Sequence, residues 1–347
     1  MNTVSKTQPR GGLRGLRDEI GVLCDAGVTG VLGIVIKTEG STYQKAGALV
    51  LLGPRGIRHG VISGGCLEPE LERRAESVFA NGTAEVVEFD TRSDEDLVFG
   101  SASGCRGRVQ LILVPLPPDA PLARALCDMP GSAFALDLAL TADGEATGAG
   151  RATVVARNSA AAAGPAARSF CWDATGRDAD AAPAATISLR IMPPGQLLLL
   201  GAGPETVPLT AFAQRLGWYV SVVEHRERWT AFARAAAADD IITIAPRLAG
   251  EKLPERIADA AIIMSHNFEI DLQHLRFCAD SALAYVGLLG PPARRDALLA
   301  ELGAGAEKLR GRLHAPVGLD LGGTGPEAIA LAAVAELQQH FARDGHA

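Results

Sequence analysis

The chain has 347 residues, of which 48% are hydrophobic and only 5% aromatic, and its formal net charge is −7. A nucleic-acid-binding protein needs cations for phosphates and rings for base stacking, so this composition disfavours that class. At roughly 150 residues per domain, the length predicts about two domains.

The chain shows no sign of membrane insertion or export. No apolar run reaches the ~18 residues of a membrane helix, and the first residues lack a charged segment followed by an apolar core. The cysteines are widely spread and form no CxxC pair, which is typical of a reduced compartment. We therefore expect a cytoplasmic protein without a membrane partner. The six cysteines are Cys24, Cys66, Cys105, Cys127, Cys171 and Cys278.

The first third of the chain predicts a mixed α+β fold. A helix is expected over residues 13–25, because apolar residues recur there at helical spacing. Strands are expected at 28–38, 47–52, 57–62 and 84–89, separated by polar or glycine-containing turns.

A glycine–cysteine stretch follows the third of these strands. Gly64 and Gly65 permit a tight turn, and Cys66 precedes a helix that has Pro69 in its first turn and runs to about residue 80. A thiol near a helix N-terminus is favoured as thiolate, although three glutamates within the next six residues oppose this effect. The alternative is that Cys66 is a small buried apolar residue.

A second glycine–cysteine stretch, Gly104-Cys105, leads into an apolar strand at 109–114. If Cys66 and Cys105 converge in space, they suit a thiophilic metal or the handling of sulfur. A closed zinc site is a weaker alternative, because it needs four ligands. The loop at residues 39–45 carries hydroxyl groups and a lysine that suit an anion, or it is simply an exposed hairpin loop.

The middle of the chain is poorly defined by its sequence. A helix is expected at 119–129, and short strands alternate with an alanine-rich segment between residues 132 and 190. Pro193-Pro194-Gly195 is the best linker candidate. We therefore place an N-terminal domain at residues 13–192 and a C-terminal domain at 193–345.

From residue 196 onward, buried strands alternate with helices, which predicts a Rossmann-like doubly wound parallel sheet. Gly201 and Gly203 follow the first apolar strand and precede a helix, as in a dinucleotide-binding loop. Glu224 ends the next strand, where an acidic residue would take ribose hydroxyls. Thr206 stands where the third glycine of that fingerprint is expected.

His266 follows the apolar strand at 261–264, at the edge of the sheet where ligands of this fold bind. It is a candidate acid or base, or alternatively a helix-capping or core histidine. Glycine-containing stretches at 287–290 and 314–323 are expected to line the same cleft.

Together these stretches resemble the XdhC/CoxI family, the accessory proteins of molybdenum hydroxylases such as xanthine dehydrogenase and carbon monoxide dehydrogenase. The similarity extends from about residue 13 to residue 341, and residues 119–190 do not contribute to it. The matching segments are Ser63-Gly64-Gly65-Cys66-Leu67-Glu68, Gly104-Cys105, Gly201-Ala202-Gly203, Val223-Glu224-His225-Arg226, Met264-Ser265-His266, Tyr285-Val286-Gly287-Leu288-Leu289-Gly290 and Pro316-Val317-Gly318-Leu319-Asp320-Leu321-Gly322.

The sequence departs from the family pattern at several positions. Family members often have glycine in place of Arg106, and aspartate in place of Glu224 or Asn267. Asn267 weakens the case for a His-Asp pair in acid–base chemistry. Pro291-Pro292 replaces a basic or serine residue and removes an anion-binding helix start.

The resemblance implies a cytoplasmic chaperone for the molybdenum cofactor rather than an enzyme with catalytic residues. Such proteins bind the molybdopterin, shield it while a cysteine desulfurase supplies the terminal sulfido ligand, and deliver it to the apo-hydroxylase. A homodimer is plausible for such a family. The implied cofactor-binding residues are Gly64, Gly65, Cys66, Cys105, Gly201, Gly203, Glu224 and His266, with Cys66 and Cys105 as the candidate molybdenum contacts.

Two other functions remain open at this stage. One is an NAD(P)-dependent oxidoreductase that uses the Rossmann domain, with His266 as acid or base. The other is a scaffold that binds a partner through the cysteine-bearing domain. The Gly201–Gly203 loop could hold NAD(P) or the dinucleotide half of the molybdenum cofactor.

Overall fold

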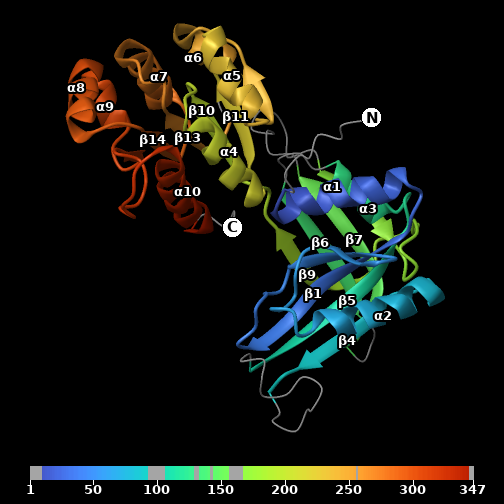
Figure 1. Ribbon diagram of the computed structural model, residues 1–347. Coiled ribbons are helices and arrows are strands. Elements are labelled where there is room, and N and C mark those ends of the chain that lie inside the picture. The colour runs from blue at the N-terminus through green and yellow to red at the C-terminus, as the bar shows by residue number, and fades with distance from the viewer. Residues whose placement is uncertain are drawn as a thin grey trace, which may run out of the picture. The chain divides into compact units, whose positions relative to one another are not determined.

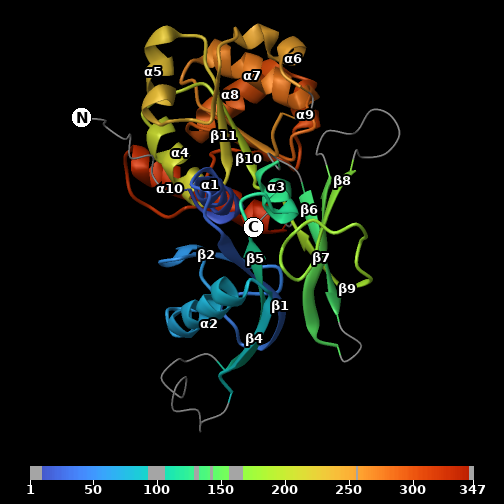
Figure 2. The same ribbon diagram turned by 90° about the vertical axis from the view of Figure 1, so that its right-hand side faces the viewer.

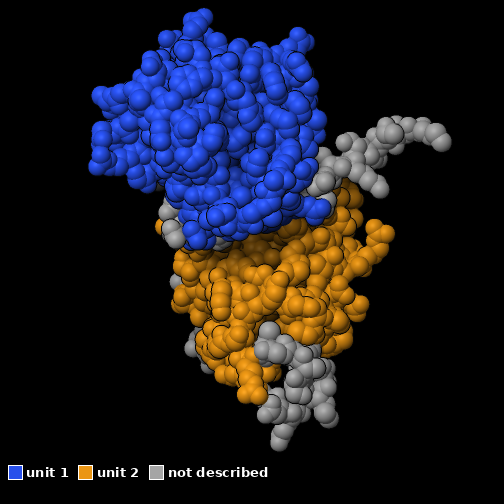
Figure 3. All heavy atoms as spheres, turned by 60° about the vertical axis from the view of Figure 1, so that its left-hand side comes forward, with its two compact units in different colours: residues 1–12, 194–347 blue, residues 13–193 orange. Residues whose placement is uncertain are grey.

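A computed structural model describes residues 10–92, 106–128, 133–140, 144–155, 167–254 and 257–343. The chain divides into two compact units (Figure 3). The N-terminal unit comprises residues 13–193, and the C-terminal unit comprises residues 194–347 together with 1–12. The division falls between Pro193 and Pro194.

The N-terminal unit is built on a five-stranded antiparallel sheet, the first sheet, with strand order β3-β2-β1-β5-β4. β1 and β5 are its longest strands and pair along most of their length, with one irregularity between Val35 and Lys37. The strands are β1 (Gly30–Gly40), β2 (Leu49–Gly53), β3 (Gly56–His59), β4 (Glu85–Asp90) and β5 (Gly107–Leu116).

A second antiparallel sheet occupies the region that the sequence leaves poorly defined. Its strand order is β8-β7-β6-β9. Trp172, the last residue of β8, is fully buried, and its indole Nε1–H donates to the Gly148 carbonyl at 3.0 Å. A Cβ on Gly150 would lie 2.3 Å from the Trp172 ring, so only glycine fits beneath the indole. The strands are β6 (Ala133–Leu140), β7 (Ala146–Val155), β8 (Ala167–Trp172) and β9 (Ala185–Ile191).

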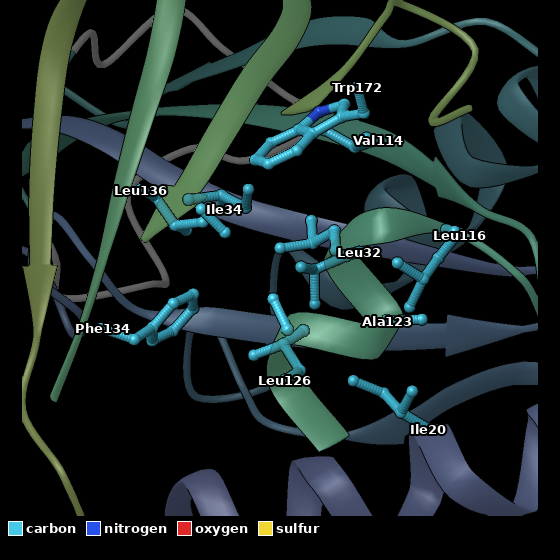
Figure 4. Packing of buried hydrophobic residues seen from close by; sticks show 14 of the residues in the cluster. Ile20, Leu32, Ile34, Val114, Leu116, Ala123, Leu126, Phe134, Leu136 and Trp172 are labelled. Carbon is cyan, nitrogen blue, oxygen red and sulfur yellow. The ribbon is translucent and has the colours of Figure 1, made fainter. Parts of the chain in front are cut away.

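Successive side chains along a strand point to opposite faces of the first sheet. Apolar residues occur at both sets of positions, so both faces of the sheet are apolar. One face packs against α2 (Glu68–Asn81), which lies along this sheet in both ribbon views (Figures 1 and 2). The other face packs against α1 (Gly12–Asp25), α3 (Pro121–Cys127) and the second sheet. Figure 4 shows this second core, in which Ile34, Leu136 and Trp172 come from different strands.

The C-terminal unit is a six-stranded parallel sheet of order β12-β11-β10-β13-β14-β15. The order reverses direction between β10 and β13, so the two halves of the sheet wind in opposite senses. This confirms the doubly wound parallel sheet. The strands are β10 (Gln196–Leu200), β11 (Tyr219–Val223), β12 (Asp240–Ile242), β13 (Ala260–Ile263), β14 (Tyr285–Leu288) and β15 (Leu313–His314).

Helices cover both faces of the parallel sheet, because its strands are apolar on both sides. One face packs against α4 (Thr206–Arg215), α5 (Glu227–Ala235) and α10 (Pro326–Arg343). The other packs against α6 (Ala249–Lys252), α7 (Phe268–Asp280) and α8 (Pro292–Leu302). The 3₁₀-helix η1 (Pro246–Leu248) and α9 (Gly305–Lys308) complete the unit. None of the helices in the described ranges is both long and apolar enough to cross a membrane.

Candidate functional site

The turn that carries Cys66 is organised by a carboxylate that follows it. One oxygen of Glu68 accepts the backbone N–H groups of Ile62 (3.0 Å) and Ser63 (2.8 Å). The other accepts the Gly65 N–H at 3.1 Å and the Ser63 hydroxyl. The Ser63 Oγ in turn accepts the N–H of Leu67 at 3.0 Å. The anion that this turn binds is therefore the chain's own carboxylate.

The electrostatics of Glu68 follow from these bonds. Burial acts to raise its pKa, but the hydrogen bonds from Ser63 and Ile62 outweigh burial and hold the pKa below its ordinary value. Glu68 is thus ionised at neutral pH. It fixes the backbone on either side of Gly64.

Cys66 itself is exposed to solvent. It is therefore not the small buried residue that was the alternative for it. Within the described chain, the N–H groups of Gly64 and Cys66 donate no hydrogen bond to the protein. The turn presents a thiol and two backbone donors on its outer side.

Two loops leave the first sheet at the edge where β4 ends and β5 begins, as its antiparallel pairing requires. They are residues 41–48, which precede β2, and residues 60–67, which contain Cys66. Gly104 and Cys105 precede β5 in the sequence and lie outside the described residues. The expected approach of Cys66 and Cys105 stays a prediction.

The loops 41–48 and 60–67 add a cation and exposed apolar side chains to this edge. The Lys45 Nζ is exposed and donates to the Thr42 Oγ1 at 3.3 Å. Tyr43 and Val61 are unusually exposed for their type, at 61% and 45%. We call the loops 41–48 and 60–67 the cysteine edge.

The second candidate site is the switch point of the parallel sheet, where β10 and β13 lead to opposite faces. Gly201 has φ of +97°, and a Cβ there would lie 2.5 Å from the Cα of Ser265. Only glycine allows the loop after β10 to approach the loop after β13 this closely.

In the glycine loop, residues 201–203, the backbone N–H groups donate hydrogen bonds within the protein. The Ala202 N–H donates to a Glu224 oxygen at 3.2 Å, and the Gly203 N–H donates to the Thr206 hydroxyl at 2.9 Å. A pyrophosphate that bound here as in a dinucleotide loop would have to displace both bonds.

Glu224 is buried, and both of its carboxylate oxygens are already in use. Besides the Ala202 N–H, they accept the Arg226 N–H at 2.8 Å, Nε at 2.9 Å and Nη2 at 2.6 Å. Burial acts to raise the Glu224 pKa, but Arg226 outweighs burial and the pKa is lowered. Each oxygen thus receives two donors, so ribose hydroxyls would have to compete with Arg226 for this carboxylate.

His266 faces the glycine loop from the β13 side. Its Nε2 lies 3.2 Å from the Oε2 of Glu205, and its backbone has φ of +57°, which is rare for a residue other than glycine. Hydrogen bonding to Glu205 raises the His266 pKa above its ordinary value, and the same bond lowers the pKa of Glu205. The two side chains form an ion pair when His266 is protonated.

A buried network holds the rest of this loop. Asp271 accepts the Ser265 N–H at 3.1 Å and its hydroxyl at 2.5 Å, and it pairs with the Arg294 Nη2 at 2.7 Å. Asn267 is the N-cap of α7, where its side chain accepts the Ile270 N–H at 3.1 Å. Asn267 is therefore a structural residue here.

Several charged residues of the switch point were not identified from the sequence. Glu205, Arg226 and Arg294 fix the loops, and Glu336 binds the 314–318 segment through the His314 Nδ1 (2.8 Å) and the Gly318 N–H (2.7 Å). Glu205 and Arg226 carried a signal, since Glu205 closely follows the Gly201–Gly203 loop and Arg226 belongs to the matching segment 223–226. Arg294 and Glu336 lie on separate elements, and their partners depend on the tertiary fold.

Comparison with known protein families finds a matching family model for each of the two regions that contain these candidate sites. Residues 23–90 match the model of the XdhC and CoxI family, and residues 197–337 match the model of the XdhC Rossmann domain. The chain belongs to the XdhC and CoxI family. The first match contains the cysteine edge, the second contains the switch point, and the second sheet lies outside both.

Two similar proteins extend the XdhC/CoxI assignment over most of the chain. A Bacillus subtilis (strain 168) protein, named as a probable xanthine dehydrogenase subunit, is 28% identical over 322 residues, which cover 89% of this chain and 92% of that protein. A crystal structure from Bacillus halodurans, described as a xanthine dehydrogenase, is 28% identical and covers 93% of this chain and 94% of its own, with a TM-score of 0.74. This XdhC/CoxI protein therefore shares its order of units with both.

Proposed function

We propose that this protein is an accessory protein of xanthine dehydrogenase that binds the molybdenum cofactor, protects it during sulfuration and delivers it to the apoenzyme. Its membership of the XdhC/CoxI family and the names of its two relatives support a role with xanthine dehydrogenase. The observation that carries the finer proposal is the exposed Cys66 on a turn that the half-buried Glu68 carboxylate holds in place.

The cysteine edge has the chemistry that this cargo requires. Molybdenum and its terminal sulfur are soft, and a cysteine thiolate is the soft ligand that proteins supply. The cofactor also carries a phosphate, for which the Lys45 ammonium and the free N–H groups of Gly64 and Cys66 are suitable donors. An exposed Tyr43 offers a ring against which a flat pterin can stack.

Cys105 is the second thiol of the proposal, since it comes two residues before β5, which begins at the same edge of the first sheet. We propose that Cys66 or Cys105 contacts molybdenum while a cysteine desulfurase supplies sulfur. The client is then an apo molybdenum hydroxylase of the xanthine dehydrogenase type, and both proteins meet this chaperone in the cytoplasm, where it acts as a homodimer.

An NAD(P)-dependent oxidoreductase is less well supported. The donors of Ala202 and Gly203 are occupied, the carboxylate of Glu205 faces the glycine loop, and Glu224 is bonded to Arg226. A second buried carboxylate beside a pyrophosphate would add repulsion. The same objections apply to the dinucleotide half of the cofactor. Gly201, Gly203, Glu224 and His266 therefore remain proposed ligand residues only for a nucleotide that displaces these internal bonds.

Cofactor transfer tests the proposal. The protein, purified without oxygen from cells that make the cofactor, is mixed with apo xanthine dehydrogenase, and enzyme activity is followed. The wild type is expected to activate the apoenzyme, and Cys66→Ala or Cys105→Ala is expected to reduce that activation. Cys127→Ala is the matched control, because Cys127 is also an exposed cysteine of the N-terminal unit. Equal activation by all four proteins would contradict a role for either thiol.

A further inference from the structure

The C-terminal unit has a hollow of about 470 Å³ that lies away from the glycine loop. Its lining comes from η1, from α6 and from the second half of α7. This volume is within the range of small-molecule sites, roughly 300–1,000 Å³. Its lining residues are Pro246, Arg247, Gly250, Leu253, Gln273, Arg276, Phe277, Asp280 and Ser281.

The charge of the hollow is positive. Arg247 and Arg276 are exposed, and neither has a hydrogen bond or ion pair with any described residue. The one acidic lining residue, Asp280, is paired with the Lys308 Nζ at 2.7 Å. Two guanidinium groups are therefore available to an anion, and planar guanidinium groups bind phosphate oxygens in bidentate fashion.

The floor of the hollow is apolar and includes an aromatic ring. Phe277 is half-buried and packs on the core beneath α7, and Leu253 is buried beside it. A bare phosphate would leave this surface unused. A flat ring attached to the phosphate would cover the Phe277 ring and exclude water from it.

We propose that this hollow is a nucleotide site, in which Arg247 and Arg276 bind the phosphates and Phe277 contacts the base. The site shares no residue with the cysteine edge or with the switch point, and it does not depend on the cofactor-chaperone function. A nucleotide would thus bind to the helices of this Rossmann-like unit, and the internally bonded glycine loop would stay as it is.

Gly250 allows a test that leaves both arginines in place. A Cβ at Gly250 meets no atom within 4 Å, and the residue does not need a positive φ. Gly250→Leu therefore adds a branched side chain at a lining position where the Cβ has open space. Leucine also has the higher helix propensity.

The experiment is calorimetric titration of the full-length protein with ADP, with inorganic phosphate and adenosine as partial probes. We expect ADP to bind, each partial probe to bind at least about tenfold more weakly, and Arg247→Ala, Arg276→Ala and Gly250→Leu each to weaken ADP binding about tenfold or more. Arg234→Ala is the matched control, since Arg234 is exposed on α5 at the opposite face of the sheet. Binding should also weaken as salt increases.

Three outcomes would overturn the nucleotide site. They are no ADP binding at about 1 mM ligand, phosphate binding as tight as ADP binding, or ADP binding that persists unchanged in all three variants. Circular dichroism of each variant separates loss of the site from loss of the fold. None of these outcomes depends on pterin binding, so failure of this proposal leaves the chaperone proposal intact.

Discussion

Glu205 and His266 join the two loops of the switch point, with the Glu205 Oε2 3.2 Å from the His266 Nε2. One residue follows β10 and the other follows β13, so the pair bridges the place where the sheet changes winding. The pair also occupies the space beside Gly203, because a Cβ there would lie 3.0 Å from both side chains.

This pair makes stability depend on pH. The raised His266 pKa contributes stability below about pH 6.5, and this contribution is lost as pH rises through the folded pKa of His266. The lowered Glu205 pKa contributes stability above about pH 4.5, and this contribution is lost as pH falls through the folded pKa of Glu205. Glu205→Gln should therefore destabilise the protein more at about pH 6 than at about pH 9, by about 1 kcal/mol or less, because His266 is partly solvated. Urea unfolding of wild type and Glu205→Gln at the two pH values measures this difference in unfolding free energy. An equal loss of stability at both pH values would contradict the ion pair.

Gly201→Ala should be strongly destabilising. Alanine is strained at φ of +97°, and its methyl group would lie 2.5 Å from the Ser265 Cα, so we expect a loss of about 3 kcal/mol or more in free energy of unfolding. Gly250→Ala is the control, since its Cβ has open space and a helical backbone, and its effect should stay within about 1 kcal/mol. Thermal or urea unfolding of the two variants compares them directly. Similar losses in both would show that the close approach at Ser265 is not what requires glycine.

Glu68 should be essential to the order of the Cys66 turn. Glu68→Ala removes the acceptor of three backbone N–H groups, and we expect a loss of about 1–3 kcal/mol in unfolding free energy. Because the Glu68 pKa is lowered, the difference from wild type should be full above about pH 4.5 and shrink as pH falls through the folded pKa. Glu76→Ala, on the exposed side of α2, should cost little. Hydrogen exchange at Gly65 gives a local readout, and unchanged protection in Glu68→Ala would refute this role.

The cysteines should differ sharply in reactivity. Cys66 is exposed, whereas Cys278 is fully buried and burial raises its pKa to about 12. Iodoacetamide should therefore label Cys66 in the folded protein and label Cys278 only after denaturation. Peptide mass spectrometry with time measures both rates, and Cys66→Ser should remove the early product. Early labelling of Cys278 would contradict its burial in the core beneath α7.

Much of the parallel sheet could be predicted because its strands are continuous apolar runs between glycine-containing turns. Leu197 to Leu200 and Ala260 to Ile263 are buried on both faces, so tertiary context adds little to the pattern. Short strands were expected in the region of the second sheet, but their assembly was not, because its central anchor, Trp172, packs on a glycine, Gly150, that is distant in sequence.

The candidate sites were also predictable from the sequence only in part. The location of the glycine loop follows from the order of strand, turn and helix, but the bonding of Glu224 does not. Its partners are a neighbour, Arg226, and the loop amide of Ala202, which reach it only in the folded sheet. Similarly, the sequence marks Glu68 as a charge near Cys66, whereas the structure gives it three backbone donors.

The most direct test of the proposed function is the molybdenum and oxidised-pterin content of the protein, purified without oxygen from a host that makes the cofactor. The cofactor-chaperone proposal requires near-stoichiometric pterin in the wild type, a clear loss in Cys66→Ala or Cys105→Ala, and no loss in Cys127→Ala. Absence of pterin from the wild type, with tight NAD(P)H binding in the same sample, would contradict the proposal and favour the oxidoreductase.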